Sequence, residues 1–240
     1  MKPIFKHVLL AGLCLGMAAC ATKPDTAPSP NPEAEETVTE STPQVADPNV
    51  KNGQALLASM NLYQQAKKPL TDETKALLGK AQDAVQSGER VDAAGLLARL
   101  MAHPQRTATM YVLQGDYALQ TGEADKAQDF YRQAVNANPY TYFAHNRIAT
   151  LLRAKGLFDE ALMHYNRALD GWAGYAPAYR NRGILYDLYL GDKAKAKADY
   201  ERYRDIQLAK QDDFASTSEG REINAWIADL SRQMAQTGGR

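Results

Sequence analysis

Residues 111–139 read YVLQGDYALQTGEADKAQDFYRQAVNANP, and residues 145–173 read HNRIATLLRAKGLFDEALMHYNRALDGWA. Four positions recur between the two stretches at one constant step: Gly122, Ala127, Tyr131 and Ala134 are followed by Gly156, Ala161, Tyr165 and Ala168. A period of about 34 residues, with small and aromatic residues at fixed offsets, is typical of arrays of helix–turn–helix repeats. The pattern therefore predicts an all-α solenoid of stacked helical hairpins.

The residues around each glycine indicate how one unit folds. Amphipathic runs precede the two glycines at residues 109–121 and 142–155, and others follow at 124–136 and 158–169. Glycine can end a helix because it adopts positive φ without strain. Ala127, early in the second helix, lets the paired helices approach closely. Pro139 then stops that helix and starts the turn into the next unit.

The stretch from Tyr111 through Gly115, Gly122, Ala127, Tyr131 and Ala134 to Pro139 resembles the tetratricopeptide repeat family. The resemblance implies a helical-hairpin solenoid of about four repeats, with an array over residues 71–208 and units near 74–107, 108–141, 142–175 and 176–210. A generic helical bundle is the alternative. The first unit is the weakest, with Gly88, Ala93, Leu97 and Pro104 at the expected places.

The later units depart from the family pattern at identifiable positions. His145 stands where an aromatic residue is usual, and Ala149 where glycine is usual. The last unit restores Tyr179 and Gly183 and then carries one extra residue, so the next three pattern positions, Gly191, Ala196 and Tyr200, fall one place late. Tyr203 replaces the small residue expected near the end of the unit.

The first residues of the chain are typical of an export signal. A short basic segment precedes an apolar run that ends at Ala18, Ala19 and Cys20. Residues 1–19 are predicted to be a lipoprotein signal peptide, because two small residues before a cysteine resemble the bacterial lipobox. Cys20 is then the predicted site of lipidation. The alternative is ordinary cleavage after Ala21.

A tether is predicted to follow the cysteine. Residues 20–50 are rich in proline and acidic residues and poor in large apolar ones, a composition that does not support a packed core. Ala21 follows the cysteine in place of the aspartate that usually retains lipoproteins in the inner membrane. By resemblance this implies a lipid anchor in the outer membrane, with the chain facing the periplasm.

The composition excludes several classes of function. Lys and Arg total 28, as do Asp and Glu, so the formal net charge is zero. Nucleic-acid binding needs a concentrated basic patch, and this balance of charges does not indicate one. The two cysteines, Cys14 and Cys20, both lie at the start of the chain, which leaves the repeats without a disulfide or a thiolate metal site.

Capping elements are predicted at both ends of the array. Residues 51–70 are predicted to form a helical cap that packs against the first repeat, since residues 53–67 place apolar side chains at helical spacing. Residues 216–236 are predicted to form a second capping helix, because Ile223, Trp226, Ile227, Leu230 and Met234 make one apolar stripe. The alternative is that this stripe binds a partner or a second copy through Trp226.

A search for catalytic groups is negative. The four histidines, His7, His103, His145 and His164, include no pair at the i, i+4 spacing of a helical metal site. Neither a glycine-rich phosphate loop nor a Gly-x-Ser-x-Gly turn occurs. We therefore expect no enzyme activity, no cofactor, no metal and no small-molecule substrate.

In the resembled family, the first helix of each repeat lines a concave groove that binds an extended peptide or a partner helix. The matching positions include Thr109, Val112, Leu113, Asp116 and Leu119 in the second unit. In the third unit they are Phe143, Asn146, Arg147, Thr150 and Arg153, and in the fourth they include Arg180, Asn181, Ile184 and Asp187. Arg147, Arg153 and Arg180 are predicted to form a basic strip that could pair with a carboxylate, the alternative being an ordinary solvated face.

These features together predict an adaptor or scaffold that is anchored in the outer membrane and binds protein partners in the periplasm. Lipoproteins of similar architecture assist the assembly of a pilus or secretion complex, which is the first hypothesis for this chain. The alternatives are a scaffold for peptidoglycan enzymes and a self-assembling structural protein of the envelope. Fold alone does not decide among them.

Overall fold

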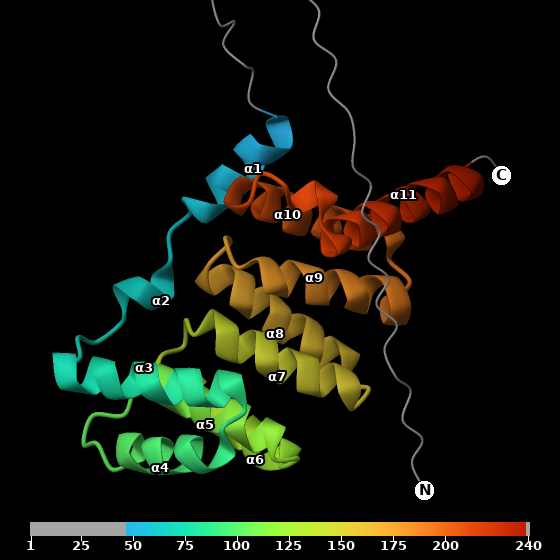
Figure 1. Cartoon of the computed structure of the whole chain (residues 1–240). Helices are drawn as coiled ribbons and strands as arrows, with labels where there is room; N and C mark the ends of the chain where they lie inside the picture. Colours follow the sequence, from blue (N-terminus) through green and yellow to red (C-terminus); the bar gives the residue numbers. More distant parts are fainter. Residues whose placement is uncertain (1–46, 239–240) are drawn as a thin grey trace, which may run out of the picture. The chain divides into compact units, whose positions relative to one another are not determined.

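The computed structural model describes residues 47–238, which form helices joined by short loops with no β-strand among them (Figure 1). The predicted signal peptide, Cys20 and residues 20–46 of the tether lie outside the described residues. Helix α1 (Pro48–Leu57) begins inside the stretch predicted as tether, which is therefore too long at its C-terminal end. Asp47 explains this start, because its carboxylate accepts a hydrogen bond from the backbone N–H of Asn49.

Four helical hairpins follow one another along the chain. They are α3 (Asp72–Ser87) with α4 (Arg90–Met101), α5 (Ala108–Gln120) with α6 (Ala124–Ala137), α7 (Tyr142–Ala154) with α8 (Phe158–Gly171), and α9 (Ala176–Leu185) with α10 (Lys193–Lys210). Each hairpin also packs against the next, since α4 contacts α5, α6 contacts α7 and α8 contacts α9. The predicted all-α array of helical hairpins is confirmed.

Each hairpin turns at a glycine with left-handed backbone geometry. Gly88, Gly122, Gly156 and Gly191 have φ values of 76°, 84°, 77° and 68°. At Gly122 the turn closes when the backbone N–H of Glu123 donates to the carbonyl of Ala118 at 2.8 Å. A side chain at such a position would be strained, so the regular spacing of the glycines sets where every first helix ends.

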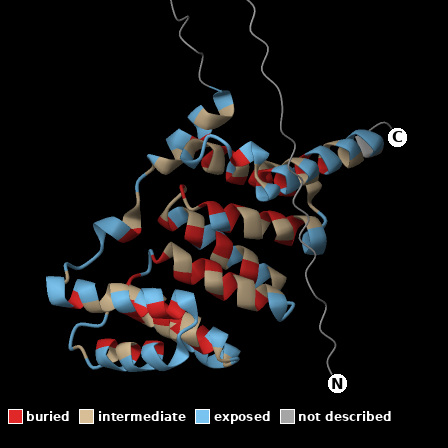
Figure 2. Ribbon diagram, in the orientation of Figure 1, coloured by how far each residue is buried: buried red, intermediate tan, exposed pale blue. Residues whose placement is uncertain are grey.

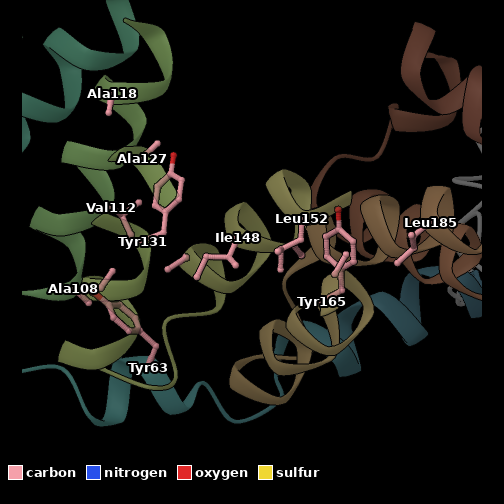
Figure 3. Packing of buried hydrophobic residues seen from close by; sticks show 14 residues of the cluster. Tyr63, Ala108, Val112, Ala118, Ala127, Tyr131, Ile148, Leu152, Tyr165 and Leu185 are labelled. Carbon is pink, nitrogen blue, oxygen red and sulfur yellow. The ribbon is translucent and has the colours of Figure 1, made fainter. Parts of the chain in front are cut away.

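The interior of each hairpin is built from small residues against an aromatic ring. Tyr131 and Tyr165 are both fully buried, as are Ala127 and Ala161 on the same helices. Figure 2 shows buried residues on the helices of the hairpins, and Figure 3 shows Ala127 beside Tyr131. A Cβ atom added at Gly115 would overlap the ring of Tyr131, so α5 and α6 approach closely only because position 115 lacks a side chain.

The extra residue of the fourth repeat is absorbed inside its first helix. Residues Tyr186–Leu190 form one π-helical turn, η1, between α9 and Gly191. A π turn holds one more residue than the α-helix it interrupts, so the insertion shifts Gly191 without disturbing the packing below it. Tyr200 still lies against Gly183, where an added Cβ would approach its ring to 2.6 Å.

The N-terminal cap differs from its prediction in form and in place. Residues 47–67, which we call the strap, contain two helices, α1 and the four-residue α2 (Leu62–Gln65). The strap does not form one helix on the first repeat, since α1 packs against α10 of the fourth repeat. Two features favour that place. Gly53 lets α1 approach the carbonyl of Asp205, where a Cβ would overlap, and Leu56 packs against the core of the last repeat.

The C-terminal helix covers the open end of the array. Helix α11 (Ser218–Gly238) follows the short η2 turn (Phe214–Ser216) and packs against α10. Ile223, Ile227 and Leu230 are buried in this contact. Tyr203 is buried at the same place, with its hydroxyl donating to a carboxylate oxygen of Glu219 at 2.6 Å. The large residue that breaks the repeat pattern at position 203 thus serves to join the array to its cap.

Candidate binding groove

The first helices of the repeats line a groove with a volume of about 810 Å³. Helices α3, α5 and α7 supply most of the lining, α9 supplies Asn181, and the strap closes one side with Tyr63, Gln64 and Lys67. This arrangement follows from the repeat, because a constant repeat length brings equivalent positions of successive first helices onto one surface.

Most of the residues predicted for the groove lie in it. The lining includes Asp116, Phe143, Asn146, Arg147, Thr150 and Asn181, and also Thr109, Val112, Leu113 and Leu119. Arg153, Arg180, Ile184 and Asp187 are not in the lining. Ile184 packs instead against the core of the last repeat, and Asp187 accepts a hydrogen bond from the hydroxyl of Tyr200 at 3.4 Å.

Arg147 is paired within the protein. Its Nη2 donates to Oδ2 of Asp116 at 2.8 Å and its Nε donates to Oδ1, so the pair is bidentate and joins α7 to α5. The hydroxyl of the buried Tyr131 also donates to Asp116, at 2.7 Å. Burial disfavours the charged form of Arg147, but the hydrogen bonds and charge of Asp116 more than offset this and raise the pKa of Arg147.

The other two arginines of the predicted strip also contact groups of the protein itself. Arg153 donates to the backbone carbonyl of Asn181 at 3.3 Å. The guanidinium of Arg180 lies 5.7 Å from the ring centroid of Trp226 and its Nε lies 3.7 Å from a carboxylate oxygen of Glu219. The structure therefore does not bring Arg147, Arg153 and Arg180 together as an open basic strip, because their charges bind acidic, carbonyl and aromatic groups of neighbouring helices.

Two amide side chains connect the third and fourth repeats at the floor of the groove. Nδ2 of Asn181 donates to Oδ1 of Asn146 at 3.0 Å, and Asn146 is only 5% exposed. Beside them, the hydroxyl of Thr150 donates to the backbone carbonyl of Asn146 at 3.0 Å. The groove floor is thus polar but uncharged at this point.

Sequence reasoning missed several lining residues, including Gln120, Tyr142 and Leu151 on the first helices and others in α3 and the strap. Gln82, Val85 and Gln86 lie in α3. A step of one repeat length back from the predicted Asp116 and Leu119 would have found Gln82 and Val85, whereas Gln86 matches Gln120, which was not predicted either. Tyr63 carries no comparable signal, since it lies outside the repeats and reaches the groove only through the path of the strap.

Family models match two parts of the chain, and both models describe the tetratricopeptide repeat. One matches residues 108–141 and the other residues 140–209. Residues 108–209 of the chain are tetratricopeptide repeats. A search of curated proteins finds no match to the sequence.

Solved structures show the same fold as this tetratricopeptide repeat protein. A thermophilic tetratricopeptide repeat protein of Thermus thermophilus is 22% identical with a TM-score of 0.50, and the match covers 67% of this chain and 82% of that one. The PilF protein of Pseudomonas aeruginosa is 17% identical with a TM-score of 0.50, covering 65% of this chain and 76% of that one. At these identities the likeness concerns the fold.

Tetratricopeptide repeats bind proteins on extended concave surfaces, so the fold supports an adaptor or scaffold for protein–protein interaction. Proteins of this family are generally not enzymes. Within residues 47–238, no cluster of three or more His, Cys, Asp or Glu side chains could hold a metal ion. No helix in this part of the chain is long and apolar enough to cross a membrane.

Two histidines that lie far apart in the sequence meet inside the third tetratricopeptide repeat. Nδ1 of His145 lies 2.9 Å from Nδ1 of His164, and Nε2 of His145 lies 3.0 Å from the carbonyl oxygen of Pro139. Because a carbonyl only accepts, Nε2 of His145 carries the proton and its Nδ1 accepts from the N–H of His164. The search for i, i+4 pairs missed this contact because it joins two helices.

Both histidines are held in the neutral form. Burial lowers the pKa of His145 below its ordinary value. Burial also lowers the pKa of His164 from 6.5 to about 4, with further lowering by His145 and by the positive charges of Arg167 and Arg132. The contact has a structural role, because both ring nitrogens of His145 and Nδ1 of His164 have hydrogen-bond partners within the protein.

Proposed function

We propose that this protein is a lipid-anchored adaptor of the bacterial outer membrane that binds a protein partner in the periplasm through its concave groove. The observation that carries the binding part is the continuous groove lined by α3, α5, α7 and the strap. The anchor part rests on the sequence before and after Cys20. Assistance in assembling a pilus or secretion complex is the process we favour, by analogy with lipoproteins of similar architecture.

The groove assignment is tested by a matched pair of leucine variants. Leu119 lies in the groove and is 38% exposed, whereas Leu190 lies outside the groove lining and is 37% exposed. Leu119→Glu introduces a charge into the groove, and Leu190→Glu introduces the same charge at an equally exposed site elsewhere. Affinity capture from bacterial envelope extracts should recover a partner with wild type and with Leu190→Glu but lose it with Leu119→Glu. Equal recovery with both variants would remove the groove from the binding function.

The anchor is tested by mass spectrometry of the mature N-terminus. Cleavage before Cys20, with a diacylglycerol on its thiol and an acyl chain on its amino group, should add the mass of these groups. Multiple acyl chains hold a protein stably at a bilayer. An unmodified chain that starts at Thr22 would contradict the anchor while leaving the groove untouched.

A further inference from the structure

The strap shows what kind of side chain the groove accepts. Tyr63 is 4% exposed although it lies outside the repeats, and Figure 3 shows it beside Ala108 at the start of α5. Its hydroxyl lies 2.6 Å from Oγ1 of Thr109. Its ring packs edge-to-face against Tyr142 and Phe143, with centroid distances of 5.9 and 5.0 Å. One corner of the groove is therefore filled by an aromatic side chain of the strap itself.

The backbone of the strap is also recognised. Nδ2 of Asn138, in the turn after α6, donates to the carbonyl oxygen of Tyr63 at 3.4 Å. At its other end the strap contacts the last repeat, where Nη2 of Arg204 donates to Oδ1 of Asn49 at 3.0 Å. The strap is thus held on the array by the packing of α1 against α10, by the ring of Tyr63 and by side-chain amide contacts.

The charges in the groove do not favour an ionic ligand. Asp116 and Arg147 neutralise each other through a bidentate pair, and Asp116 is only 18% exposed, so an anionic ligand at Arg147 would meet a charge that is already compensated. Breaking a partly buried pair leaves an uncompensated charge, which is costly. The remaining charged residue of the lining is Lys67, which lies exposed on the strap.

The rest of the lining combines amides with apolar side chains. Amide groups are supplied by Gln64, Gln82, Gln86, Gln120, Asn146 and Asn181. Apolar surface is supplied by Val85, Val112, Leu113, Leu119, Phe143 and Leu151. Amide side chains both donate and accept, as the backbone of an extended peptide requires, and the apolar residues suit uncharged side chains.

We propose that the groove, completed on one side by the strap, binds an extended and uncharged peptide segment that carries an aromatic or large aliphatic side chain. This inference rests on the proposed function and names the chemistry of its partner. It predicts that neither an acidic segment nor a free C-terminal carboxylate is the recognised element.

The test is a selection of short displayed peptides on the full mature protein, with Leu119→Glu and Leu190→Glu as parallel targets. Wild type and Leu190→Glu should enrich uncharged peptides that contain Phe, Tyr, Trp or Leu, and Leu119→Glu should not. An enriched peptide is then synthesised with both ends capped and its affinity is measured by calorimetry. Replacing its central apolar residue by Asp should weaken binding about tenfold or more, because the charge would lose its water without gaining a partner.

Two results would overturn the inference. Enrichment of acidic peptides, or about tenfold tighter binding when the C-terminal carboxylate is left free, would show that the groove does recognise an anion. In that case the proposed adaptor function would stand. If wild type enriches nothing over Leu119→Glu, the groove does not bind peptides, and the adaptor function fails together with this inference.

The contribution of the strap is tested in the same assay with Gln64→Ala and Tyr63→Ala. Gln64 is exposed on the wall of the groove. The Gln64→Ala variant should therefore bind the capped peptide more weakly, with no change in its unfolding transition. Tyr63→Ala should weaken it further. Unchanged affinity in both variants would show that the strap is not part of the site.

Discussion

The second repeat places Tyr111 and Gly115 on its first helix, and the third repeat places His145 and Ala149 at the equivalent positions. Both hairpins nevertheless bury the same tyrosine, Tyr131 or Tyr165, to 0% exposure. The two hairpins differ in the hydrogen bonds that their buried polar groups make. In the second repeat the tyrosine hydroxyl donates to the carboxylate of Asp116 at 2.7 Å.

In the third repeat the tyrosine hydroxyl lies 3.3 Å from the hydroxyl of Thr150, and a pair of neutral histidines fills the space beside the helix. The comparison teaches that the hairpin tolerates a change of chemistry when each buried polar atom retains a partner. It also predicts that the two repeats respond differently to substitution and to pH.

The largest expected effect concerns the close approach of the helices. Gly115→Ala should lower the free energy of unfolding by about 3 kcal/mol, because its Cβ would overlap the ring of a tyrosine that is fully buried and cannot swing away. The matched change in the third repeat, Ala149→Gly, should cost about 2 kcal/mol, through lower helix propensity and the loss of a buried methyl group. Urea denaturation of both variants measures the difference. Equal losses would show that the two interfaces are packed alike.

The second prediction is a pH dependence that belongs to the third repeat. The folded-state pKa of His164 is lowered to about 4, so on acidification the unfolded chain takes up a proton near pH 6.5, before the folded chain does. The contribution to stability is therefore intact above about pH 7 and is lost as the pH falls towards 4. We expect this loss to be about 2 kcal/mol.

Thermal or urea unfolding of wild type and His164→Asn at several pH values isolates this contribution. Asparagine keeps a donor near the position of Nδ1 and does not titrate. The pH dependence of stability that comes from carboxylates is the same in both proteins, so it cancels when their free energies of unfolding are subtracted. The charged groups that bear on the pair, Arg132, Arg167 and Asp170, are unchanged in the variant. A difference that stays constant from pH 7 to pH 4 would contradict the assignment.

The smallest expected effect separates the two tyrosine hydroxyls. Tyr131→Phe removes a hydrogen bond to a carboxylate and should cost about 2 kcal/mol, while Tyr165→Phe removes a hydroxyl–hydroxyl contact and should cost about 1 kcal/mol. Both changes keep the ring and its packing. If Tyr165→Phe costs as much as Tyr131→Phe, the charge of Asp116 adds nothing to the bond.

The repeat period made the hairpins predictable because it is a local property of the chain. Gly122 and Gly156 end their helices through their own backbone freedom, and Tyr131 and Tyr165 follow at fixed helical offsets. The same register placed Asp116, Asn146 and Asn181 in the groove. Positions that depend only on helix periodicity were thus available from the sequence.

The partners of the charged and polar groups were not available in this way. Arg147 was predicted to face a ligand, but it pairs with Asp116 of the preceding repeat. The distance between their side chains depends on how far one hairpin rotates against the next. His145 and His164 meet for the same reason, across two helices that the sequence separates by 19 residues.

The sequence by itself determined that the chain forms helical hairpins, where each one turns, and which helix faces contain the groove positions, because small residues and glycines act within one or two helical turns. Only the tertiary structure decided that the strap crosses to the last repeat, that Tyr63 lies in the groove, and that Arg147 of the groove is already paired with Asp116. These contacts join distant parts of the chain, such as Asn49 and Arg204, and depend on the summed geometry of all the repeats between them.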